Sequence, residues 1–263
     1  MSDRKLAVVT GASSGIGAVY ADRLAKRGYD LLLVARRRDR LETLAKEIAA
    51  KHGVKVDTLE ADLAKDGDVA KVEHVLSTNP AVHVLVNNAG TAKLAPIQQT
   101  TPEQARGQIA VNITALVRLT QAVLPAFLKR NEGVIINIAS VLSIKALTIS
   151  AVYSGTKGFV SLFTLGLQEE LAGTGVKVQL VNPATTATEI WEVGGISLSD
   201  LNQDAIMTTD NLVDAALAGF DQGEKVTWPS VADATLWDSY EDARVKLFAA
   251  TQTGKPAPRY KVA

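Results

Sequence analysis

The stretch LAVVTGASSGIGAVYADRLAKRG, residues 6–28, decides the fold. It begins with four apolar residues in a row, which are typical of a strand buried on both faces of a parallel sheet. Three glycines then fall within seven residues, and apolar residues from Ile16 to Leu24 recur at helical spacing until Gly28. A strand, a glycine-rich turn and a helix in this order present backbone N–H groups and a helix N-terminus to a phosphate.

The glycines of this turn are Gly11, Gly15 and Gly17, spaced G-x-x-x-G-x-G. This differs from the G-x-G-x-x-G fingerprint of many dinucleotide sites, and no lysine follows the last glycine as it would in a Walker A loop. A tight turn that needs positive φ would also favour glycine. The position between strand and helix favours the phosphate-binding interpretation.

The strand–helix pattern continues along the chain. Further apolar or alternating runs lie at residues 31–34, 54–59, 82–86, 133–138, 176–181 and 226–228. We therefore predict one domain over residues 1–263, an α/β doubly wound parallel sheet, Rossmann-like, of about seven strands with helices on both faces. Residues 185–210 lack a clear period and are expected to form a substrate loop or lid. Residues 251–263 are expected to form a polar C-terminal tail.

The second apolar run leads to Arg36, at the position where an NAD-binding unit would carry an Asp or Glu for the ribose 2′-hydroxyl, and Arg37 follows it. Basic residues at the start of a helix oppose its dipole, so helix stability does not explain them. Charge-assisted hydrogen bonds to a 2′-phosphate would explain them, which favours NADP over NAD. A solvated basic turn is the alternative.

Polar residues follow the next two strands, where open α/β sheets bind ligands. Asp62, with Leu63 after it, could accept a hydrogen bond from an adenine amino group or could cap the next helix. The run NNAG at residues 87–90 follows the fourth strand. Its small residues would let a cofactor approach the backbone, while its amides could instead tie strand ends together.

Two further features place polar groups on helical segments. Tyr153 and Lys157 are four residues apart, so they share one face of a helix. An ammonium beside a phenol lowers the pKa of the tyrosine, which suits general acid–base catalysis. A tyrosine packed on a lysine stem is the alternative.

Asn112 lies among apolar residues of a long helix that begins at Thr101 and Pro102. An asparagine in such surroundings needs a hydrogen-bond partner.

Composition narrows the function classes. The 28 basic residues balance the 28 acidic ones, which argues against a nucleic-acid partner and leaves self-association unopposed. The chain has no Cys and only three scattered His, so no metal site is expected. The start lacks the apolar core of a signal peptide, and no apolar run approaches about 18 residues. We therefore expect a cytoplasmic protein with no membrane partner.

With these motifs, the chain resembles the short-chain dehydrogenase/reductase family over roughly residues 5–230. Four motifs carry the resemblance: TGASSGIG at residues 10–17, NNAG at residues 87–90, Ser140, and Tyr153-x-x-x-Lys157. Ser140 stands thirteen residues before Tyr153, and Asn112 lies in the preceding helix. Each motif alone is weak evidence for the family, but the order and spacing of the four motifs together are specific for it.

The resemblance implies an oxidoreductase that moves a hydride between NADP(H) and a ketone or secondary alcohol. Tyr153 would act as the general acid or base on the substrate oxygen, and Ser140 would hydrogen-bond the same oxygen. Lys157 would lower the pKa of Tyr153 and hold the nicotinamide ribose. Asn112 would anchor a water near Lys157.

The resemblance also implies the remaining site residues and the assembly. Substrate would contact Ser140, Leu142, Tyr153 and Trp191. The apolar loops at residues 142–149 and 190–207 indicate a hydrophobic substrate, and core packing of these side chains is the alternative. A homo-oligomer, tetramer or dimer, is expected. The implied cofactor-binding set is Gly11, Ser13, Ser14, Gly15, Ile16, Gly17, Arg36, Arg37, Asp62, Leu63, Asn88, Ala89, Gly90, Tyr153, Lys157, Pro183 and Thr188.

Two positions depart from the family pattern. The usual Pro-Gly after the sixth strand reads Pro183-Ala184, whose methyl could crowd the cofactor or restrict the loop. Ser13 and Ser14 stand where NADP-dependent members often carry a basic residue. A non-catalytic dinucleotide-binding sensor or scaffold on the same fold is the alternative function. Such a protein would be expected to have lost some of the Ser/Tyr/Lys residues, and this chain has all three. Enoyl reduction is a third possibility, against which the short Tyr–Lys spacing counts.

Overall fold

Seven parallel strands form one sheet in the part of the chain that this computed structural model describes, residues 4–261. Their order is β3-β2-β1-β4-β5-β6-β7, so the predicted doubly wound sheet is confirmed. The strands are β1 (Leu6–Thr10), β2 (Asp30–Ala35), β3 (Val56–Glu60), β4 (Val82–Asn87), β5 (Gly133–Ile138), β6 (Val176–Val181) and β7 (Val226–Thr227).

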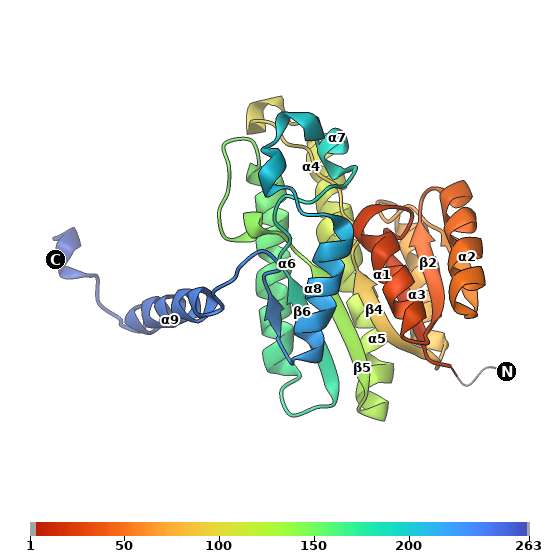
Figure 1. Cartoon of the computed structure of the whole chain (residues 1–263). Coiled ribbons are helices and arrows are strands. Elements are labelled where there is room, and N and C mark those ends of the chain that lie inside the picture. The colour runs from red at the N-terminus through yellow and green to blue at the C-terminus, as the bar shows by residue number, and fades with distance from the viewer. Residues whose placement is uncertain (1–3, 262–263) are drawn as a thin grey trace. The chain divides into compact units, whose positions relative to one another are not determined.

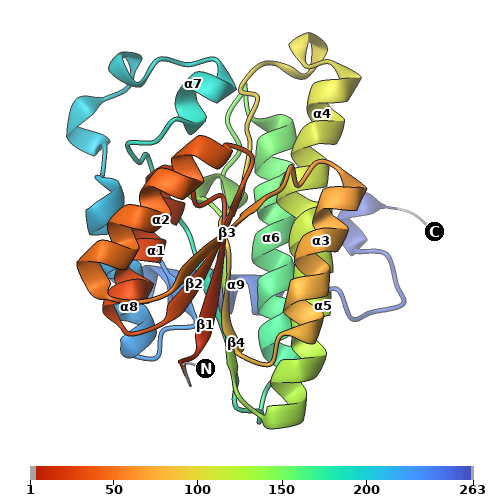
Figure 2. The same ribbon diagram turned by 90° about the vertical axis from the view of Figure 1, so that its right-hand side faces the viewer.

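Helices cover both faces of the sheet (Figure 1, Figure 2). Helices α1, α2 and α8 bury Tyr20, Leu41 and Leu212 against one face. Helices α3, α5 and α6 pack on the other face around Leu76 and Phe127. The helices are α1 (Gly15–Lys26), α2 (Arg38–His52), α3 (Asp66–Thr78), α4 (Pro102–Ile109), α5 (Leu116–Arg130), α6 (Ala151–Glu170), α7 (Ile190–Gly194), α8 (Thr209–Asp221) and α9 (Thr235–Ala250).

The order of the strands explains why the glycine-rich turn lies where a ligand could bind. Strand β1 pairs with β2 on one side and with β4 on the other, so the chain reverses its winding direction here. The crevice outside the carboxyl ends of strands at such a reversal is where open α/β sheets bind ligands. Every residue of β1 is buried, as its unbroken apolar run predicts.

The long helix that contains Asn112 is not α-helical throughout. Between α4 and α5, residues Ala110–Ala115 form a π-helical turn, and the sequence pattern did not predict it. Such single-turn insertions are rare and occur often at functional sites. The helix begins as expected, because Thr101 accepts a hydrogen bond from the Gln104 backbone in a capping box and Pro102 follows.

By length and composition, this same helix is the one in the described residues that could cross a membrane. It runs from Pro102 to Arg130, and its most apolar window has a mean hydropathy of 1.4. This finding differs from the expectation that no segment is long and apolar enough to span a membrane. A core helix passes the same test, and Leu119, Val123 and Phe127 of α5 are fully or almost fully buried in the fold.

Contacts divide the chain into two compact units, residues 1–229 and 230–263. The first contains the whole sheet and all the predicted site residues. In the second, every side chain of α9 is at least partly exposed. The single domain over residues 1–263, the substrate loop at 185–210 and the tail at 251–263 stay predictions.

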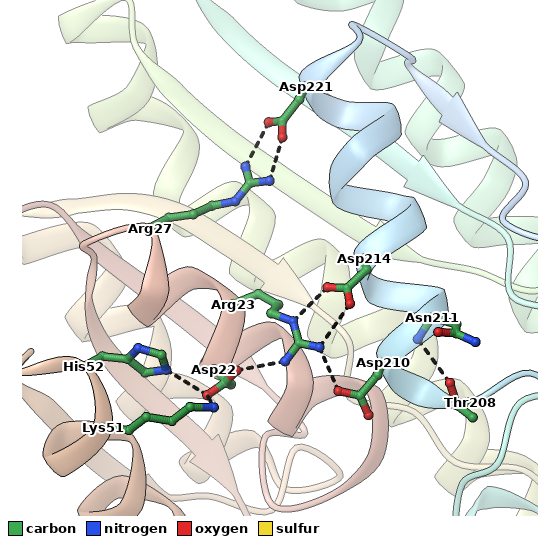
Figure 3. A network of polar contacts seen from close by, with 10 residues as sticks. All are labelled: Asp22, Arg23, Arg27, Lys51, His52, Thr208, Asp210, Asn211, Asp214 and Asp221. Carbon is green, nitrogen blue, oxygen red and sulfur yellow. Dashed lines mark hydrogen bonds and ion pairs between the residues drawn. The ribbon is translucent and has the colours of Figure 1, made fainter.

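Ion pairs join α1, α2 and α8 on one face of the sheet (Figure 3). Arg23 of α1 donates hydrogen bonds to Asp210 and Asp214 of α8 and to its neighbour Asp22. Arg27 binds both carboxylate oxygens of Asp221, at 2.8 and 2.6 Å. Because α8 begins at Thr209, within the last residues of the expected substrate loop at 185–210, these pairs hold the C-terminal end of that loop.

We expect Arg23→Ala to destabilise the fold by about 1 kcal/mol, because solvent partly screens the half-exposed aspartates that it leaves unpaired. The melting temperature should fall by about 2–4 °C for a chain of this size. Thermal unfolding followed by circular dichroism measures this. Arg106→Ala is the matched control, since it breaks an exposed pair with Glu103 within one helix and should not shift the transition. Equal shifts for the two variants would refute the role of the network.

Candidate active site

A cleft of about 600 Å³ opens at the carboxyl ends of the central strands. Its walls come from the glycine-rich turn, the ends of β2, β4, β5 and β6, helix α6 and the segment around α7. Ligand sites commonly have this size and position. All the predicted site residues line the cleft except Gly17 and Asn112, which lie behind its wall.

The glycine-rich turn lies against the end of β4. A Cβ on Gly11 would lie 2.8 Å from Ala89 Cα, and one on Gly17 would lie 2.4 Å from the Gly11 carbonyl oxygen. Gly11 also has a φ of +65°. The Asn88 amide donates to the carbonyl oxygens of Thr10 and Gly11 at 2.9 and 3.2 Å. The amide therefore ties strand ends together, and Gly11 and Gly17 are needed because the turn packs closely against itself and against the end of β4.

The two arginines expected at the adenine end have different surroundings. Arg36 is exposed at the rim of the cleft. Arg37 donates to the hydroxyl oxygens of Ser13 and Ser14 at 3.0 and 2.8 Å. It also donates to the Glu189 carboxylate at 2.7 Å. The guanidinium thus lies beside the glycine-rich turn, where a ribose phosphate would be held.

The sequence pattern did not predict Glu189, which lines this end of the cleft, or its partner Arg40, which lies just outside the lining. Arg40 donates to the second carboxylate oxygen of Glu189 at 2.6 Å. Hydrogen bonds from Arg40 and Arg37 lower the pKa of Glu189 to about 2. No local pattern links a glutamate to arginines about 150 residues earlier, so only the folded chain brings these groups together.

Asp62 and Leu63 line the cleft after β3. The alternative that Asp62 caps the next helix is wrong, because α3 begins at Asp66 and follows Lys65. The Asp62 carboxylate instead accepts from the backbone N–H of Ala64 at 3.1 Å. This local turn leaves the residue at the cleft wall.

Tyr153 and Lys157 lie on the buried side of α6. The Lys157 ammonium donates to the Ile138 carbonyl oxygen at the end of β5, at 2.8 Å, and lies 5.8 Å from the centre of the Tyr153 ring. Ser140, two residues beyond Ile138, hydrogen-bonds to the Tyr153 hydroxyl and accepts from the Leu142 backbone. The strand end and the helix thereby bring all three polar groups to the floor of the cleft.

The pKa of Tyr153 shifts in the direction opposite to the one expected. Burial raises it to about 12, because the phenolate would lose its hydration, and the hydrogen bond with Ser140 offsets only part of this rise. Burial also lowers the pKa of Lys157 to about 8. At neutral pH the tyrosine therefore keeps its proton and the lysine is mostly charged.

Asn112 does not line the cleft, but its hydrogen bonds connect two segments that do. Its side-chain nitrogen donates to the Thr91 carbonyl oxygen and to the Thr156 hydroxyl, both at 2.9 Å. Its side-chain oxygen accepts from the Thr91 backbone N–H at 2.9 Å. These bonds join the segment after β4 to α6, next to Lys157, and they explain a buried polar residue in an apolar helix.

The segment after β6 completes the opposite wall. Apart from Asn131 and Lys261, no non-glycine residue in the described part of the chain has positive φ, so the methyl of Ala184 meets no backbone strain. Thr188 faces the glycine-rich turn, since a Cβ on Gly15 would lie 3.2 Å from its methyl. The Trp191 indole donates to the Thr186 carbonyl oxygen at 2.8 Å.

Apolar side chains line the part of the cleft beyond Tyr153. They extend from the segments after β4 and β5, from the π-helical turn and from α7, so four separate parts of the chain enclose this space. The lining residues of this kind are Leu94, Val111, Leu142, Leu147, Ile190, Trp191 and Val193.

Residues 5–194 match the short chain dehydrogenase family, and this region contains every residue of the site described above. Among solved structures, the chain is similar to a short-chain dehydrogenase from Sphingobium yanoikuyae in complex with NADPH. The two are 43% identical with a TM-score of 0.93, and the match covers 96% of this chain and 98% of the other.

Two other relatives differ in the substrates that their names give. The bulky-bulky ketone specific alcohol dehydrogenase from Comamonas testosteroni is 36% identical with a TM-score of 0.90, over 98% of this chain and 99% of the other. Very-long-chain 3-oxoacyl-CoA reductase-B from Danio rerio is 34% identical over 193 residues, which are 72% of this chain and 62% of the relative. The chain thus spans less than two thirds of the length of that relative.

Proposed function

Because this chain belongs to the short-chain dehydrogenase family, we propose that it is an oxidoreductase that transfers hydride between NADP(H) and a hydrophobic ketone or secondary alcohol. The observation that carries the proposal is the convergence of Ser140, Tyr153 and Lys157 on the floor of the cleft, beside the glycine-rich turn. A non-catalytic sensor would not need a buried proton donor hydrogen-bonded to a serine.

When bound, NADPH supplies the hydride that reduces the carbonyl carbon. Tyr153 donates its proton to the carbonyl oxygen, since its raised pKa keeps the phenol protonated at neutral pH. The Ser140 hydroxyl hydrogen-bonds the same oxygen as negative charge develops there. The Lys157 ammonium stabilises the phenolate that remains and holds the nicotinamide ribose. Asn112 positions α6 and the Thr91 segment, and the water near Lys157 stays a prediction.

Two observations support NADP over NAD. Arg36 and Arg37 follow β2 without the acidic residue that binds a ribose 2′-hydroxyl. The similar Sphingobium yanoikuyae structure contains NADPH. Charge-assisted bonds from Arg37 and the Ser13 hydroxyl suit the three oxygens of a 2′-phosphate.

We expect Arg37→Ala to raise the Kd for NADPH about 10- to 100-fold, because it removes charge-assisted hydrogen bonds to the phosphate. The Kd for NADH should change by less than about threefold, since NADH has no 2′-phosphate. Fluorescence titration of the reduced nucleotides measures both constants. Arg38→Ala is the matched control, because Arg38 pairs with Glu42 outside the cleft. Equal losses for NADPH and NADH would refute the assignment.

We further propose a ketone that carries a bulky apolar group on each side. Apolar side chains from four segments line the cleft near Tyr153, and a cleft of about 600 Å³ could hold such a substrate. The Comamonas testosteroni relative is named for ketones of this kind. A 3-oxoacyl thioester is the second candidate, because the Danio rerio relative is named as a 3-oxoacyl-CoA reductase and such a substrate also presents a ketone.

Ketone-dependent oxidation of NADPH tests the proposal. A panel should contain aryl ketones with two bulky substituents, methyl ketones of equal size and a 3-oxoacyl thioester. The proposal predicts the highest kcat/KM for the first group. Binding of NADPH without oxidation by any of these carbonyls would favour the non-catalytic alternative.

The cytoplasmic location and the homo-oligomer also belong to the proposal. Exposed apolar side chains on α5 and α6 support self-association, among them Leu128, Phe159 and Leu162. Light scattering of the purified protein would give the number of copies. A monomer at micromolar concentration would contradict the oligomer.

A further inference from the structure

Glu189 connects the expected 2′-phosphate site to the substrate side of the cleft. One of its carboxylate oxygens accepts from Arg37 at 2.7 Å and from the Ser14 hydroxyl at 3.2 Å. The other accepts from Arg40 at 2.6 Å. The three donors lie in the glycine-rich turn and at the start of α2, whereas Glu189 is the residue that precedes α7.

Glu189 is also part of the structure of α7. Its backbone carbonyl accepts from the Val193 N–H at 3.1 Å, which closes the first turn of this short helix. Trp191, two residues later, lines the cleft where substrate would bind. The carboxylate of Glu189 therefore tethers the segment that carries Trp191 to the adenine end of the cleft.

A phosphate monoester and a carboxylate bind to the same hydrogen-bond donors. Each is an anion whose oxygens accept from guanidinium and hydroxyl groups, and arginine binds both with paired hydrogen bonds. Arg37 already directs its donors to Ser13, Ser14 and Glu189. A phosphate beside Ser13 must therefore share Arg37 with Glu189, and two anions this close repel each other.

We propose that Glu189 competes with the 2′-phosphate of NADP(H) for Arg37, Arg40 and Ser14, so that phosphate binding releases the α7 segment. This inference rests on the proposed NADP site and adds two properties to it. Glu189 lowers the affinity for the phosphorylated cofactor, and it transmits the presence of the 2′-phosphate to Trp191. NAD(H) has no 2′-phosphate, so it leaves the tether between Glu189 and the arginines in place.

Nucleotide fragments test the competition without turnover. Adenosine 2′,5′-bisphosphate carries the 2′-phosphate, and adenosine 5′-monophosphate lacks it. By calorimetry, Glu189→Gln should lower the Kd for the bisphosphate about tenfold, because the arginines lose an anionic competitor. The Kd for the monophosphate should change by less than about twofold. Glu192→Gln is the matched control, since it removes one exposed charge from the same helix, and it should change both constants by less than about twofold.

Hydrogen exchange tests the release of α7. In the wild type, the bisphosphate should raise the exchange rate of the backbone N–H groups of Val193 and Ile196, and the monophosphate should not. In Glu189→Gln, these groups should exchange fast before any nucleotide is added. An unchanged or higher Kd for the bisphosphate in Glu189→Gln, or no exchange response in the wild type, would overturn the inference. If Arg37→Ala still weakens NADPH binding in that case, the proposed cofactor site stands without this competition.

Discussion

Replacing Tyr153 with phenylalanine should lower kcat for ketone reduction about 10³-fold or more while the Kd for NADPH stays within about twofold. The hydroxyl is the proton donor of the proposed reaction, and burial holds its proton with a pKa of about 12. Phenylalanine keeps the ring that packs in the buried site and removes only the oxygen. Single-turnover oxidation of bound NADPH by an aryl ketone separates this chemical step from binding.

A second tyrosine provides the matched control. Tyr20 is fully buried in the core, and its hydroxyl oxygen has no hydrogen-bond partner within residues 4–261. Tyr20→Phe should therefore leave kcat unchanged and should not destabilise the fold. Ser140→Ala should lower kcat about 10²-fold, since it removes one hydrogen bond to the developing charge. Reduction at near wild-type rates in Tyr153→Phe would eliminate the proposed acid.

The second large effect is a pH dependence that Lys157 controls. We expect kcat/KM for reduction to be constant near neutral pH and to fall as the pH rises through about 8, where burial places the pKa of Lys157. The lysine is charged below its pKa, so the active form is lost as the pH rises. Tyr153 keeps its proton over this range because its pKa is raised to about 12, so it cannot produce the same transition.

Lys157→Met identifies the group that titrates. Methionine fills a similar apolar volume without the charge, so kcat/KM at neutral pH should fall about 10²-fold or more and the transition near pH 8 should disappear. A profile measured from about pH 6 to about pH 10 covers both limits. A transition near pH 8 that persists in Lys157→Met would assign it to another group.

Local patterns predicted the sheet and the grouping of the candidate site residues in one cleft. The apolar run before Gly11 is the fully buried β1, and its burial on both faces is a direct consequence of a parallel sheet with helices on each side. The i, i+4 spacing of Tyr153 and Lys157 places both on the buried side of α6. Because parallel strands end at the same edge of a sheet, polar residues such as Asp62 and Ser140 meet in one cleft.

Features that depend on long-range contacts were not predicted. Glu189 contacts Arg37 and Arg40 only because the chain folds back over about 150 residues. Asn112 binds Thr91 and Thr156 from within a π-helical turn, and apolar periodicity carries no signal for such an insertion.

The expected direction of the pKa shift of Tyr153 was wrong, because burial also depends on long-range contacts. Spacing gives the distance between two groups on a helix, but it does not give their burial. Desolvation of the phenolate raises the pKa of Tyr153 by more than the hydrogen bond with Ser140 lowers it, and Lys157 is itself buried.

The most direct test of the proposed function is the stoichiometry of one reaction. Purified wild-type protein, NADPH and a ketone with two bulky apolar substituents should give one alcohol for each NADPH oxidised, and deuterium from NADPH labelled on the nicotinamide ring should appear on the carbinol carbon. Tyr153→Phe should bind NADPH equally well and form the alcohol about 10³-fold more slowly. If NADPH binds and no alcohol forms from any ketone of the panel, or if Tyr153→Phe forms it at the wild-type rate, the proposed function is contradicted.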